Sequence, residues 1–85
     1  MKKIVCSVYD CKSAVYGSPM VFSTRGEAIR SFDSGVKDSK TMLYKYPADF
    51  TMHVLGEFDD NCGKLLPFDQ PEFLAKAQDF VNIDD

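Results

Sequence analysis

TRGEAIRSFDSGVK, residues 24–37, carries the clearest local signal in this chain of 85 residues. Thr24 and Glu27 have the spacing of a capping box, in which the threonine hydroxyl accepts a hydrogen bond from the third helical residue and the glutamate reaches back to the cap. Apolar side chains then recur at helical spacing on one face, at Ala28, Ile29, Phe32 and Val36. The stretch therefore predicts an amphipathic helix from about Arg25 to Lys37.

The residues before this helix predict two strands. Residues 3–9 alternate, so that one face of a half-buried strand carries Ile4, Cys6 and Val8. Tyr9 then lies on the opposite face. A short run, Met20–Phe22, follows Pro19 and is interpreted as a returning strand, because proline suits a strand entry. The intervening residues 10–18 are predicted to form a turn or loop.

The residues directly after the helix predict a connection and a third strand. Residues 38–50 are expected to be extended or turned, because Pro47 disfavours helical geometry at Tyr46. Residues 51–58 alternate in the manner of a strand, with Gly56 as a candidate bulge.

The rest of the chain predicts a hairpin and a second helix. Residues 59–63 have turn chemistry, and residues 64–66 would complete the hairpin. A helix is predicted over residues 71–78, with Pro71 in its first position. Residues 82–85 form a short acidic tail. The expected fold is α+β, with a small, mainly antiparallel sheet, the order β-β-α-β-β-α and the helices packed on one face.

Length and composition bound the class of protein. Residues 1–85 form one domain, and a hydrophobic content of 45% argues against disorder. No apolar run approaches the roughly 20 residues of a membrane span, so no membrane partner is expected. The amino-terminal run loses its apolar character at Tyr9, which indicates a strand and not an export signal. Three cysteines, an odd number, favour a reducing compartment, so a cytosolic location is expected.

The sequence offers little for catalysis or metal binding. His53 is the only histidine, and no serine or cysteine can be placed beside it from the sequence. A zinc site would combine this histidine with Cys6, Cys11 and Cys62, but the short ligand pairs of structural zinc sites are missing. We therefore expect a protein that is not an enzyme and that has no metal and no cofactor.

Charge divides the chain into two unlike parts. Residues 1–46 hold eight basic against four acidic residues, a net charge of +4, whereas residues 47–85 hold two against nine, a net charge of −7. All four tyrosines lie in the basic part. Cations beside aromatic rings suit single-stranded nucleic acid, because phosphates attract cations and unstacked bases attract flat rings. The candidate binding residues are Lys2, Lys3, Tyr9, Lys12, Tyr16, Arg25, Arg30, Lys37, Lys40, Tyr44, Lys45 and Tyr46.

Two observations leave this interpretation open. A pI near 5.0 opposes phosphate binding, and scattered lysines on an ordinary surface, with tyrosines in a core or interface, account for the same residues. A nucleic-acid site requires the basic part to present one continuous face with its tyrosines, and the acidic part to be turned away from it.

Four ordered blocks carry a family resemblance. Residues 5–10 (VCSVYD), 26–32 (GEAIRSF), 46–50 (YPADF) and 55–59 (LGEFD) resemble successive blocks of the small nonstructural protein of gokushoviruses, which are bacteriophages of the Microviridae with single-stranded DNA genomes. The resemblance implies a DNA-binding protein in the host cytoplasm that acts when single-stranded genomes are replicated and packaged.

The hypotheses differ in the partner. The first is a homodimer that binds single-stranded DNA, since dimerisation would lengthen a basic groove and hide strand edges. The alternative is an acidic protein-interaction module that contacts a phage or host replication protein. A weaker third hypothesis is an inhibitor whose acidic residues mimic DNA.

Overall fold

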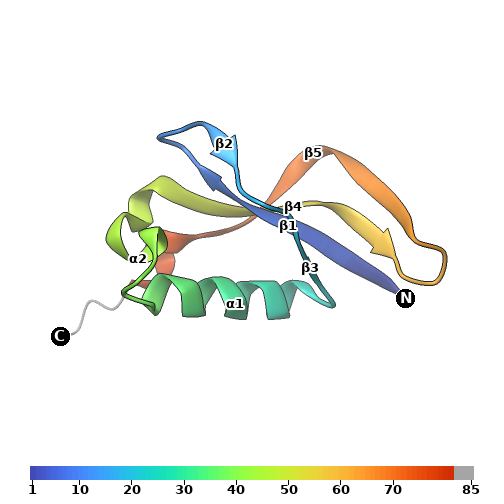
Figure 1. The fold of residues 1–85 in the computed structure, drawn as a ribbon, viewed down its shortest axis with the longest axis horizontal. Helices are drawn as coiled ribbons and strands as arrows, with labels where there is room; N and C mark the ends of the chain where they lie inside the picture. Colours follow the sequence, from blue (N-terminus) through green and yellow to red (C-terminus); the bar gives the residue numbers. More distant parts are fainter. Residues whose placement is uncertain (82–85) are drawn as a thin grey trace.

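An antiparallel sheet of five strands with one long helix on one of its faces makes up residues 1–81, the part of the chain that the computed structural model describes (Figure 1). The strand β1 (Lys2–Asp10) is central: β4 (Phe50–Asp59) pairs with one of its edges, and β2 (Val15–Tyr16) and β3 (Met20–Phe22) pair with the other. The long strand β5 (Lys64–Lys76) pairs with the outer edge of β4. The expected α+β class with a small antiparallel sheet is confirmed. The predicted acidic tail, residues 82–85, lies outside the described residues.

The helix α1 (Arg25–Lys37) has the predicted bounds and begins with the predicted cap. The Thr24 hydroxyl accepts from the backbone N–H of Glu27 at 3.1 Å. The carboxylate of Glu27 accepts from the N–H of Ser23 at 3.0 Å, one residue before the expected partner. The capping box thus satisfies two free N–H groups at the start of the helix, although its returning bond was predicted to the wrong residue.

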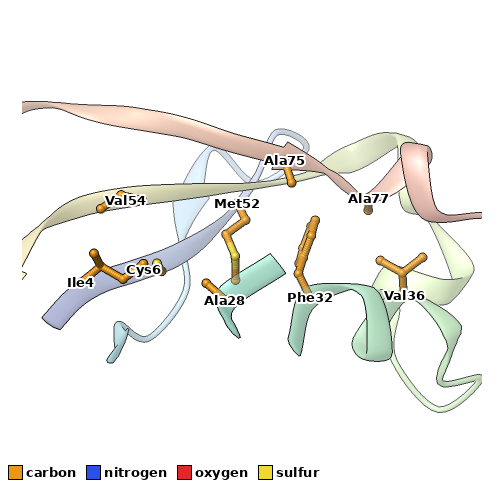
Figure 2. Close-up of a cluster of buried hydrophobic side chains, with 9 residues drawn as sticks. All are labelled: Ile4, Cys6, Ala28, Phe32, Val36, Met52, Val54, Ala75 and Ala77. Carbon is orange, nitrogen blue, oxygen red and sulfur yellow. The ribbon is translucent and has the colours of Figure 1, made fainter. Parts of the chain in front are cut away.

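The core lies between α1 and one face of the sheet (Figure 2). From the helix, Ala28, Phe32 and Val36 point toward the strands. Opposite them are the alternate residues of three strands: Ile4 and Cys6 of β1, Met52 and Val54 of β4, and Ala75 of β5. β1 and β4 therefore give alternate side chains to the core, β5 adds Ala75, and the intervening side chains of β1 and β4 lie on the other face of the sheet.

That other face of the sheet is not covered by a helix. Figure 1 shows α1 and the short helix α2 (Met42–Lys45) on one side of the strands, and no helix of residues 1–81 above them on the other side. We call the surface opposite α1 the open face. None of the helices described is long and apolar enough to span a bilayer.

The predicted second helix, residues 71–78, is wrong. Residues up to Lys76 belong to β5, and only a 3₁₀ turn, η2 (Ala77–Phe80), follows. Phe73 pairs with His53 of β4, and Ala75 pairs with Met52. The backbone hydrogen bonds to β4 override a local pattern that suited a helix. The element order is therefore β1-β2-β3-α1-α2-η1-β4-β5-η2, and not the expected β-β-α-β-β-α.

Two connecting segments contain short elements that were not predicted. Residues 42–45 form α2, whose first turn is capped by the Thr41 hydroxyl accepting from the N–H of Tyr44 at 3.2 Å. The 3₁₀ turn η1 (Pro47–Asp49) follows it. Residues 10–18 hold β2 because Ala14 adopts a left-handed backbone conformation (φ 59°) that turns the chain, and alanine gives no turn signal in a sequence.

The strand β4 bends where the bulge was expected. Its register with β1 shifts by one residue, so that Leu55, directly before Gly56, has no partner in β1. Gly56 pairs with Pro67 of β5 at very close range. A Cβ atom on Gly56 would lie 2.5 Å from the carbonyl oxygen of Leu66 and 2.8 Å from the Cα atom of Pro67. The absence of a side chain is therefore required for β5 to pair with β4 at this point.

Replacing Gly56 by Ala should destabilise the protein by at least about 1–3 kcal/mol, because backbone atoms would have to move to admit the methyl group. Urea unfolding measures the change. The matched control is Gly26→Ala in α1, where the nearest atom to a new Cβ is the Thr24 hydroxyl at 3.8 Å. This control should keep or raise the free energy of unfolding, because alanine favours helix over glycine. Equal stability of Gly56→Ala and the parent chain would contradict the argument.

Candidate functional site

Four rings cross the open face from one edge of the sheet to the other. They come from successive strands: Tyr16 of β2, Tyr9 of β1, His53 of β4 and Phe73 of β5. The ring centroids of Tyr9 and Tyr16 are 4.7 Å apart, those of Tyr16 and His53 5.7 Å, and those of His53 and Phe73 5.9 Å. We call this set of four residues the aromatic stripe. The rings are close enough to form one continuous surface.

Strand register places these rings on one face, where Tyr9, Tyr16 and His53 contact one another and His53 contacts Phe73. Tyr16 is the direct partner of Tyr9, and Phe73 is the direct partner of His53, so each pair lies on one face. The buried hydroxyl of Ser7 donates to the carbonyl oxygen of Gly17 at 2.7 Å and holds the chain after β2 against β1. The two ends of the stripe are open to solvent, with Tyr16 43% and Phe73 55% exposed.

His53 occupies the centre of the stripe as a neutral ring. Its Nε2 atom lies 2.8 Å from the hydroxyl oxygen of Thr51, and its Nδ1 atom is buried with no hydrogen-bond partner among residues 1–81. Burial lowers the pKa of His53 below its ordinary value of 6.5, because a charged imidazolium loses hydration there. At neutral pH the stripe is therefore uncharged along its length.

Two lysines lie on the same side of the stripe, each three residues farther along the chain than one of its rings: Lys12 after Tyr9, and Lys76 after Phe73. Lys12 is in the exposed turn that joins β1 to β2, beside Tyr9 and Tyr16. Lys76 pairs with Thr51, so it lies on the open face near Phe73. Within residues 1–81 neither lysine forms an ion pair. A chain that follows the stripe thus finds both cations on the same side.

Only part of the predicted set of binding residues comes together. Tyr9 and Tyr16 meet in the stripe and Lys12 lies in the turn that joins their strands, whereas Lys2 and Lys3 lie at the far end of β1, on the order of 20 Å away along the strand. The remaining candidates belong to α1, to α2 or to the chain flanking α2, in the helical layer on the other side of the sheet (Figure 1): Arg25, Arg30, Lys37, Lys40, Tyr44, Lys45 and Tyr46.

Three stripe-associated residues were missed, and all come from the acidic part of the chain. His53 carried a usable signal, because the alternation of residues 51–58 places it opposite the buried Met52 and Val54. Phe73 and Lys76 carried no such signal, because the local pattern of residues 71–78 suits a helix and does not show which of these side chains would share a face with His53. The interface is therefore built from both parts of the chain.

The condition set from the sequence for a nucleic-acid site built from the basic part, a continuous basic face turned away from the acidic part, is not met. The Arg25 guanidinium donates two hydrogen bonds to the Glu72 carboxylate, at 2.8 and 2.9 Å, and these bonds lower the pKa of that carboxyl group. Asp60 accepts from the terminal ammonium of Met1 at 2.9 Å and lies 3.8 Å from Lys3. Antiparallel pairing of β1 with β4, and the packing of the start of α1 near β5, bring the two signs together. These contacts also tie up two carboxylates of the acidic surface that a protein-interaction module would use.

The cysteines lie apart from the stripe. Cys6 is fully buried in the core, as expected, while Cys11 and Cys62 are exposed in turns, and all three are free thiols. Burial raises the pKa of the Cys6 thiol, which suits a small core residue. Among residues 1–81 no three side chains of the histidine, cysteine, aspartate or glutamate type gather in an arrangement that could hold a metal ion.

Fold and site together define a small α+β protein with an exposed aromatic sheet face. The chain belongs to the family described as Phage ORF5 protein, whose profile matches residues 3–80. It is 39% identical over 67 residues to Protein ORF5 of Chlamydia phage 1, a match that covers 74% of this chain and 70% of that protein. No solved structure matches the chain significantly.

These findings confirm the resemblance at the level of the phage family, because Chlamydia phage 1 is a gokushovirus. Both descriptions name a phage gene product without an activity. The protein is therefore a bacteriophage protein, and its DNA binding stays a prediction.

Acid should destabilise the fold through His53. The unfolded chain takes up a proton near pH 6.5, whereas the folded chain resists protonation to a lower pH, so the free energy of unfolding should fall as the pH drops from about 7 to about 5. Urea unfolding across this range measures the slope. His53→Phe keeps a ring in the stripe but cannot titrate, so its stability should change less with pH. Equal slopes for the two proteins would contradict a neutral, buried His53.

Proposed function

We propose that this protein is a non-enzymatic phage protein that binds single-stranded DNA through the aromatic stripe, in the host cytoplasm, during genome replication and packaging. The observation that carries the proposal is the continuous row of four rings on a sheet face that no helix of residues 1–81 covers. Exposed rings on an antiparallel sheet are a recurrent platform for unstacked bases.

Stacking on this surface favours a single strand over a duplex. The bases of a single strand can leave one another and lie on Tyr16, Tyr9 or Phe73, whereas the bases of a duplex are already stacked and paired. His53 offers no free donor or acceptor at the centre of the stripe, because its Nε2 atom faces Thr51 and its Nδ1 atom is buried, so the polar groups of the stripe are the hydroxyls of Tyr9 and Tyr16. Recognition of this kind depends little on base identity, as every base has a flat face.

Phosphate contacts in the proposal come from Lys12 and Lys76, and not from the whole basic part of the chain. The net charge of −3 opposes DNA at long range, but these two lysines, unpaired within the described residues, lie on one side of the stripe, Lys12 toward its β1–β2 part and Lys76 toward its β5 part. The electrostatic share of the binding free energy is therefore small, and stacking has to supply the rest. Affinity should still fall with salt, because each phosphate contact releases a bound cation from the strand.

Replacing Tyr16 or Phe73 by Ala should weaken binding of an unstructured oligonucleotide by about 1–3 kcal/mol for each stacked base lost. Fluorescence anisotropy of a labelled single strand, titrated at two salt concentrations and compared with its duplex, measures the change. Both side chains are largely exposed, so the fold should tolerate their removal.

Tyr44→Ala is the matched control. Tyr44 is 52% exposed, close to the exposure of Phe73, but it belongs to α2 in the helical layer. Its removal should leave the affinity unchanged. The proposal fails if the parent chain does not bind a single strand at low salt, if salt has no effect, or if Tyr44→Ala weakens binding as much as Phe73→Ala.

A further inference from the structure

The open face has a second region, at the opposite end of the strands from the stripe. There Val5, Pro19, Leu55, Leu65, Leu66 and Pro67 line an open hollow of about 300 Å³. Val5 and Tyr9 are four residues apart on β1, which separates hollow and stripe by about 13 Å along the strand. The hollow exists because Gly56, at its floor, has no side chain and brings β5 close to β4.

The chemistry of the hollow excludes DNA as its occupant. Its lining is almost wholly aliphatic, and Glu57 is the one ionisable residue among the side chains that border it. A base placed there would leave the polar groups of its edge without partners, and a phosphate would meet a carboxylate and no cation. Aliphatic side chains fit it, because release of water from its apolar lining favours association.

The same surface carries a side chain of the kind that would fill the hollow. Leu65 lines its rim and is 65% exposed, and Val21, which pairs with Val5 on the opposite side, is 52% exposed. A concave apolar region beside projecting apolar side chains is self-complementary, as an interface with twofold symmetry requires. Scattered apolar residues need no partner, but a contiguous apolar region with a hollow is typical of a binding surface.

Charges around the hollow are compatible with a second copy of the chain. In a twofold contact a group on the axis meets its own equivalent and a group away from the axis meets a different residue, so an end of the sheet that carries one sign alone would repel the other copy. At this end of the strands the terminal ammonium of Met1 and the ammonium of Lys3 both lie against Asp60, and Lys64 pairs in the ladder with Asp59. Both signs are thus present beside the hollow, and Glu57 is the ionisable residue that borders it.

We propose that the hollow is the surface through which two copies of this chain associate, with Leu65 of each copy packed against the apolar surface of the other. Centred on the hollow with their strands antiparallel, the two copies would carry their aromatic stripes at opposite ends of the dimer, where both stay exposed. Association through the hollow does not require DNA binding. In the dimer, two aromatic stripes would be available to one DNA single strand.

Sedimentation equilibrium tests the association over about 1 to 200 µM protein. The parent chain should be a dimer within this range, and Leu65→Lys should weaken self-association by about thirtyfold or more, as loss of a buried apolar anchor at an interface does. Val21→Lys should act in the same direction. Circular dichroism and the unfolding midpoint verify that each variant is folded, which the exposure of both residues favours.

Met42→Lys is the matched control, because Met42 is 56% exposed but lies on α2, away from the open face. It should associate like the parent chain. A parent chain that stays monomeric at about 200 µM, or folded Leu65→Lys and Val21→Lys variants that still dimerise, would overturn the proposal. The two proposals can fail separately. A monomeric Leu65→Lys variant that still binds a single strand would support both the dimer surface and a separate DNA site. A parent chain that dimerises but binds no single strand would contradict the proposed DNA site and not the dimer surface.

Discussion

The packing of α1 on the paired strands β1 and β4 is the contact on which the other features of this protein depend. Ala28, Phe32 and Val36 of the helix face the side chains that alternate into the core from the strands, Met52 and Val54 among them. One helix can cover only one face of a sheet, and residues 1–81 contain no second long helix. The opposite face is therefore left to rings and aliphatic side chains, which a protein of this size cannot bury on its own.

Pairing of β1 with β4, and of β4 with β5, also explains how a chain with divided charge forms one site. The antiparallel ladder lays a basic amino-terminal strand along an acidic hairpin, so that Lys3 reaches Asp60, while Arg25 reaches Glu72 of β5 from the start of α1. The same ladder brings the ring of Tyr9 within 6.3 Å of the ring of His53, centroid to centroid. Charge along the sequence was thus a poor guide to charge on the surface. The open face instead has two regions, an aromatic one and an aliphatic one, with different chemistry at the two ends of the same strands.

Local signals in the sequence were reliable where the hydrogen bonds of an element join residues that are close together in the chain. The helix Arg25–Lys37 follows from a cap and an apolar stripe that lie within fourteen consecutive residues, and the turn before Lys64 follows from its aspartates and Gly63, whose φ of 72° suits glycine. The prediction failed for residues 71–78, where a proline and an apolar stripe imitate the start of a helix. There the distant partner β4 supplies the hydrogen bonds that decide the conformation.

The sequence by itself determined the fold class, the main helix, the core faces of β1 and β4 and the phage family, because these depend on alternation, capping and ordered blocks that are written locally. Only the tertiary structure decided which residues share a surface. Register places Tyr16 on Tyr9 and Phe73 on His53, and the close approach at Gly56 opens the hollow. No periodicity encodes these relations, because each one joins residues from strands that meet only when the sheet has formed.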